Sequence, residues 1–195
     1  MNGIPLLLLF IYSTFTINLV LQCGLGIKGV VESKGSMDLT TLIRASIIFF
    51  SIILLWFFFS RVLYSIIPGV FIYIILFPLS AVCYSGFEYL IFKVLLKKDI
   101  KEGSIINFPA GITAAAVFIC INLANSFIEV VILSFGLTAG IFLINVIIRE
   151  IRYRAALEAV PVFLRGKPLI LIAMGLLSLI FTTGSLLLFR MINAG

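Results

Sequence analysis

The side chains able to carry redox, metal or ion chemistry in this sequence are few, and all lie in apolar surroundings. The three cysteines, Cys23, Cys83 and Cys120, are odd in number and widely spread, which excludes a disulfide framework. There is no histidine, so the usual haem and zinc ligand and the commonest general base are missing. Glu88 and Glu129 interrupt apolar sequence, where an ionisable group is costly unless it is paired or hydrated. Thiolate and carboxylate chemistry at these positions is therefore what the sequence offers.

Each glutamate has two interpretations, which the sequence leaves open. Glu88 can relay a cation or bind a coupling ion, or it can form a structural salt bridge with Lys93 or with a base near the cytoplasmic boundary. Glu129 lies two residues inside the start of an apolar run. It can belong to the same ion path, or it can be a carboxylate favoured by the positive end of a helix dipole.

The composition predicts one integral membrane domain over residues 1–195. The chain is 63% hydrophobic with a mean hydropathy of +1.29, whereas soluble domains are about 45–50% apolar. The net charge is +6, but the basic residues flank apolar runs, where they set orientation and contact lipid headgroups. No aromatic-basic interleaving on a polar surface supports nucleic-acid binding. The expected surroundings are a lipid bilayer, with no nucleic acid.

The apolar runs predict an all-α membrane protein of six transmembrane helices, since each run approaches the roughly 20 residues that a bilayer requires. The predicted helices cover about 4–27, 42–59, 69–95, 105–123, 127–148 and 169–189. Gly24 and Gly26 weaken the second half of the first helix, which either breaks at membrane depth or ends there. Pro109 weakens the first turn of the fourth helix. Gly136 and Gly140 give the fifth helix a small-residue face suited to close packing.

The basic residues are distributed unequally between the two sides of the predicted membrane. Twelve of the 14 lie in or beside the odd-numbered loops, and the exceptions are Arg61 and Arg190. The positive-inside rule then places both termini outside the cytoplasm. Three helices on each side of a polar loop predict two inverted halves, about 1–96 and 104–195. In such folds the interrupted helices mark the site, so we expect it between the first and fourth helices, near the midplane.

The last third of the chain carries a recognisable series of motifs, which are Ile151-Arg152-Tyr153-Arg154, Val160-Pro161, Leu164-Arg165-Gly166-Lys167-Pro168 and the run from Leu171 to Leu179. This series resembles the end of the RnfA/NqrE branch of the Rnf/Nqr electron-transport membrane subunits. Asn18 to Leu21 with Leu25-Gly26 is similar to the family's first helix, Phe108-Pro109 with Thr113 to its fourth, and Glu88 to a glutamate in its third.

The resemblance implies a six-helix inverted repeat in the bacterial inner (plasma) membrane. Two such subunits pair in opposite orientations within an ion-translocating oxidoreductase complex, which couples electron transfer to sodium or proton transport. The implied partners are therefore other Rnf/Nqr-type membrane subunits, above all an opposite-topology paralogue. The chain would contribute to the ion path and the electron route of this translocase without being catalytic alone. The alternative from the fold alone is a small-solute permease or a membrane component of one.

The family holds a two-iron–two-sulfur cluster between paired subunits, with one cysteine each from the first and fourth helices. Here the matching positions are Lys28 (or Gly26, with a small shift) and Ala115, none of which can ligate iron. Cys23 and Cys120 lie five residues before and five after the family positions, offsets opposite in direction. They are either displaced cluster ligands or small buried apolar residues.

Overall fold

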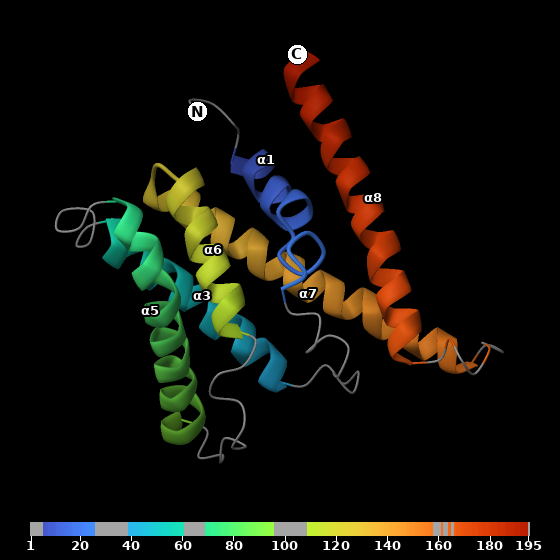
Figure 1. Ribbon diagram of the computed structural model, residues 1–195, viewed down its shortest axis with the longest axis horizontal. Helices are drawn as coiled ribbons and strands as arrows, with labels where there is room; N and C mark the ends of the chain where they lie inside the picture. Colours follow the sequence, from blue (N-terminus) through green and yellow to red (C-terminus); the bar gives the residue numbers. More distant parts are fainter. Residues whose placement is uncertain are drawn as a thin grey trace. The chain divides into compact units, whose positions relative to one another are not determined.

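The computed structural model describes residues 6–25, 39–60, 69–95, 109–157, 161, 164 and 166–194. Every regular element among these residues is helical, and the described residues include no strand. The elements are α1 (Leu6–Ile11), the π-helical η1 (Tyr12–Thr16), α3 (Leu39–Phe58), α5 (Gly69–Tyr89), the π-helical η3 (Leu90–Leu95), α6 (Pro109–Leu123), α7 (Phe127–Leu157) and α8 (Lys167–Ala194) (Figure 1). The predicted all-α class is confirmed.

Helices occupy part of each of the six predicted ranges, but they differ in length. Those long and apolar enough to cross a membrane lie at Ile74–Lys93, Phe127–Ala156 and Lys167–Gly184. The shorter apolar helices are Leu6–Thr16, Ile43–Phe58 and Gly111–Leu123. These fall below the roughly 20 residues that span a bilayer. The count of six spans therefore stays a prediction, and so do the two inverted halves.

The described residues divide into two compact units, one within residues 38–135 and one formed by residues 1–37 with 136–195. In the first unit α3, α5 and α6 lie side by side (Figure 1). Helix α5 buries one residue per turn on a single face, and these residues are Leu76, Ser80, Tyr84, Glu88 and, in η3, Phe92. Spacing of four residues keeps side chains on one face of a helix. This face carries the unit's buried carboxylate into the core.

The second unit packs the N-terminal segment against α7 and α8. Its core consists of buried residues from these three elements, which are Val20, Leu21, Ile144, Ile148, Ile170, Met174 and Phe181. Gly136 and Gly140 of α7 make the close approach possible. A Cβ atom at Gly140 would lie 2.8 Å from the Thr14 carbonyl oxygen and 3.0 Å from Asn18 Nδ2. The predicted packing role of this small-residue face is thus confirmed.

Two predicted helix boundaries are wrong, each for a physical reason. The first helix ends at Thr16 instead of near Ile27, because side chains upstream of the glycines take over its backbone hydrogen bonds. Helix α7 continues to Leu157 instead of ending near Ile148. Charged residues end an apolar run without ending a helix, and Arg154 Nε bonds Glu150 Oε1 at 2.9 Å along the extension.

We expect Gly140→Ala to destabilise the protein by about 1–3 kcal/mol, the usual cost of overpacking a close contact. The reason is that the added methyl group meets backbone of the N-terminal segment, which has no room to move away. The matched control is Gly175→Ala in α8, where a Cβ meets nothing within 4 Å. Thermal unfolding in detergent, followed by circular dichroism, compares the two, and equal midpoints would contradict the packing described.

Candidate functional site

The first helix stops at a point where its own hydroxyl groups compete for its backbone. Ser13 Oγ and Thr14 Oγ1 both donate to the Phe10 carbonyl oxygen, at 2.9 and 2.8 Å. The helix widens into η1, and the Ile17 N–H bonds the Tyr12 carbonyl five residues back at 3.1 Å. Side-chain bonds of this kind weaken and bend helices. Residues 17–25 then continue without regular helix, although Leu19, Val20 and Leu21 are buried.

Asn18 satisfies the buried backbone that follows the break. Its Oδ1 accepts hydrogen bonds from the N–H groups of Val20 and Leu21, each at 3.2 Å. Its Nδ2 donates to the Thr14 carbonyl oxygen at 3.3 Å. Asn18 is 1% exposed. An asparagine therefore replaces the missing helical partners, because buried N–H groups without acceptors are costly.

Helix α8 supplies the remaining polar contacts of the broken segment. Ser178 Oγ donates to the Leu21 carbonyl oxygen at 3.3 Å, and Gln22 Nε2 donates to Thr182 Oγ1 at 3.1 Å. Ser178 and Thr182 are four residues apart and share one helix face. Gly24 turns the chain with a φ of 65°, a conformation that favours glycine. This face of α8 was missed by sequence reasoning, although the spacing of its two hydroxyls was visible.

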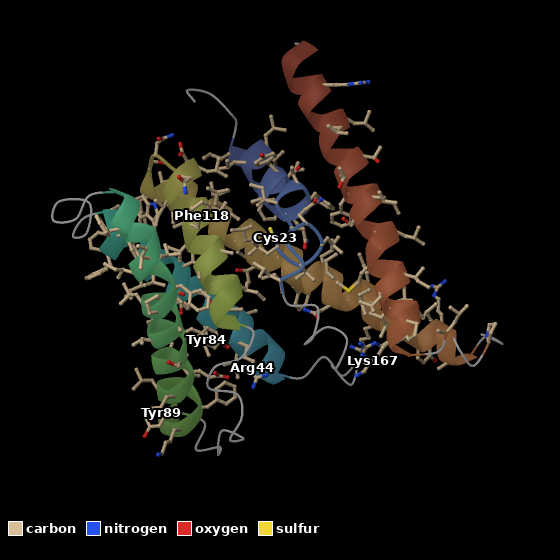
Figure 2. All side chains as sticks on the ribbon, in the orientation of Figure 1. Cys23, Arg44, Tyr84, Tyr89, Phe118 and Lys167 are labelled. Atoms are coloured by element: carbon tan, nitrogen blue, oxygen red, sulfur yellow. The ribbon has the colours of Figure 1, made fainter. Side chains whose placement is uncertain are left out.

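A buried ion pair forms the second site, in the unit containing α3 and α5. Arg44 Nε lies 3.3 Å from Glu88 Oε1, and the Glu88 side chain is 6% exposed while that of Arg44 is 48% exposed. The Arg44 guanidinium also lies over the Phe92 ring, 5.9 Å from its centroid. Figure 2 labels Arg44 on α3 and Tyr84 on α5, one turn before Glu88. The base that pairs Glu88 is thus Arg44, whereas Lys93 lies over the Tyr89 ring at 4.8 Å.

Glu129 has the contacts of a helix cap. The Glu129 N–H donates to Ser126 Oγ at 3.3 Å, and Glu129 Oε2 accepts from the Asn125 N–H at 2.8 Å. This Ser-x-x-Glu arrangement is a form of capping box at the start of α7. The carboxylate also complements the positive end of the helix dipole. Its place on an ion path stays a prediction.

The two cysteines considered as cluster ligands lie in different units and different environments. Cys23 is exposed in the irregular segment after the break (Figure 2). Cys120 is fully buried in α6, with its Sγ 3.9 Å from Ser134 Oγ. The described residues hold no group of three or more metal-ligating side chains. A thiol enclosed in this way does not fit a cluster shared with another subunit. Lys28 and Gly26 lie outside the described residues, and Ala115 is partly buried in α6.

We expect Asn18→Ala to expose the backbone after the break to exchange. The substitution leaves the buried N–H groups of Val20 and Leu21 without their acceptor, at a cost of about 1–3 kcal/mol per group. Hydrogen exchange followed by mass spectrometry should show faster exchange at these amides. Asn145→Ala is the control, because the Asn145 amide donates to the Ile141 carbonyl within α7 and holds no irregular backbone. Unchanged protection in Asn18→Ala would refute the capping role.

Comparison with known proteins gives one partial relationship to a membrane redox complex. No family model matches the chain. The chain is 40% identical over 65 residues to one of the subunits of the ion-translocating oxidoreductase complex of Pectobacterium atrosepticum. The matched segment covers 33% of this chain and 34% of that relative, so it spans about a third of the relative's length. The chain is therefore similar over this segment to a component of an ion-translocating complex.

Proposed function

We propose that this chain is a membrane subunit of an Rnf/Nqr-type ion-translocating electron-transport complex. The observation that carries the proposal is the 40% identity over 65 residues to a component of an ion-translocating oxidoreductase complex. Three helices with the length and composition of membrane spans agree with a protein embedded in the bilayer. Other membrane subunits, including a paralogue of opposite topology, would be its partners in the bacterial inner membrane.

The ion path of this proposal passes Glu88. A carboxylate in the candidate span Ile74–Lys93 is the kind of group that marks cation pathways in membrane proteins. Arg44 neutralises it at 3.3 Å, yet about half of the Arg44 side chain remains exposed. Arg44 thus acts as a tethered cation that a transported ion displaces from Glu88. Glu129 is the second carboxylate of the proposed path.

The broken N-terminal helix supports an inverted-repeat architecture with a site at mid-depth. The apolar helix Leu6–Thr16 is roughly 16 Å long at the α-helical rise, about half of a 30 Å hydrocarbon core. Helices that end at this depth are common beside transport sites, because irregular backbone is tolerated where protein shields it. In the proposed arrangement both termini lie outside the cytoplasm.

We expect Glu88→Gln to slow redox-driven cation uptake by roughly tenfold, the effect of losing about 1.4 kcal/mol of cation binding. The measurement uses the purified complex in proteoliposomes, supplied with a reduced electron donor. Uptake is followed with radioactive sodium and, in parallel, with a pH-sensitive dye inside the vesicles. Glu129→Gln tests the second carboxylate in the same assay.

The matched control for this assay is Glu150→Gln. Glu150 is an exposed carboxylate on α7, where it pairs with Arg154 at the surface. Normal uptake in Glu88→Gln would remove Glu88 from the path. A complex without any redox-driven uptake, although electron transfer proceeds, would overturn the proposed function itself.

We expect Cys120→Ala to leave the iron content of the purified complex unchanged, because the thiol is enclosed beside Ser134. Cys23→Ala is measured alongside, with iron analysis and paramagnetic resonance on the same samples. Signals that survive both substitutions would be held by partner subunits. Loss of one cluster signal in both variants would instead make these cysteines displaced ligands, which the enclosure of Cys120 argues against.

A further inference from the structure

A groove with aromatic walls opens where α3 ends and α6 turns into α7. Its volume is about 800 Å³, within the range of sites for small molecules and lipid chains. Trp56, Phe57 and Phe127 form its walls. The rings of Trp56 and Phe127 are 6.4 Å apart at 51°, so they converge without stacking face to face. All of these residues belong to one unit, and the groove is separate from the Glu88 site and from the broken helix.

The groove has one polar end. Ser60 and Asn125 line it together with the small side chain of Ala124. The Asn125 N–H donates to Glu129 Oε2 at 2.8 Å, which brings a carboxylate within one hydrogen bond of the lining. No charged side chain is among the described residues that line the groove. The nearby formal charge that these contacts define is therefore negative.

We propose that this groove binds a phospholipid with an ammonium headgroup, such as phosphatidylethanolamine. Tryptophan and phenylalanine rings mark the level of the membrane interface, where apolar chains meet polar headgroups. The walls suit an acyl chain, and the faces of Trp56 and Phe127 attract a cation. The Glu129 carboxylate adds a charge complement that an anionic headgroup lacks. The proposal holds whether or not the chain works in a redox complex.

The capping box of α7 gives the carboxylate its fixed position. Because Ser126 Oγ and Glu129 Oε2 bond each other's backbone turn, the carboxylate cannot turn away without uncapping the helix. Glutamine can form the same capping contact but carries no charge. Glu129→Gln therefore separates the headgroup preference from the structure of the turn.

The chain contains a single tryptophan, Trp56, so its fluorescence reports on the groove alone. The full-length protein is reconstituted in nanodiscs of phosphatidylglycerol that contain a fixed fraction of lipid with brominated chains. In one series the brominated lipid is phosphatidylethanolamine, and in the other it is phosphatidylglycerol. Both carry a phosphodiester, so the comparison isolates the ammonium group. Bromine quenches tryptophan only at short range, and we expect quenching several-fold stronger with phosphatidylethanolamine.

Two variants and a control decide between a site and ordinary contact with surrounding lipid. Ala124→Leu fills the polar end and should abolish the preference, and Glu129→Gln should abolish it while the emission spectrum stays that of a folded protein. Glu150→Gln, a carboxylate elsewhere on α7, should keep the preference. Equal quenching by the two lipids in the unmodified protein would overturn the proposal. A preference that survives Glu129→Gln would also overturn it, since the carboxylate is its source.

Discussion

A bilayer core offers no water to backbone N–H and C=O groups, so a helix that ends inside apolar surroundings needs substitutes for its lost hydrogen bonds. The N-terminal segment meets this constraint after Thr16 with one side chain and one neighbouring helix. Asn18 accepts from two buried N–H groups, and Ser178 donates to a carbonyl of the same stretch. The bare glycine surface of α7 matters for the same reason, because only close packing keeps lipid away from this backbone.

The ion pair between Arg44 and Glu88 follows a related logic for charge. Removing one member of a buried pair leaves the other without compensation, which is far costlier than the pair is stabilising. Here the cost falls unequally, because Glu88 is enclosed while about half of Arg44 is exposed. The arginine can reach water on its own, but the glutamate depends on a cation beside it. That asymmetry is what makes the carboxylate, and not the arginine, the natural partner of a mobile ion.

Much of the fold could be predicted from the sequence because long apolar runs have few alternatives to helix. The close-packing face at Gly136 and Gly140 was also visible, since small residues four apart share one side of a helix. The break in the first helix lies earlier than predicted, because Asn18, and not Gly24 or Gly26, controls the backbone there. Likewise the partner of Glu88 could not be read from spacing, since Arg44 lies on another helix and only packing brings the two together.

The position of Arg44 ahead of Glu88 in the chain has a consequence for biosynthesis. During synthesis α3 emerges first, and its arginine can stay at the headgroups because long basic side chains reach the interface. When α5 follows, its glutamate meets a waiting counter-charge and need not enter lipid alone, where a charged residue costs about 2.5–3.5 kcal/mol at the helix centre. The order of the two helices thus makes membrane insertion of the acidic one a docking step onto its predecessor.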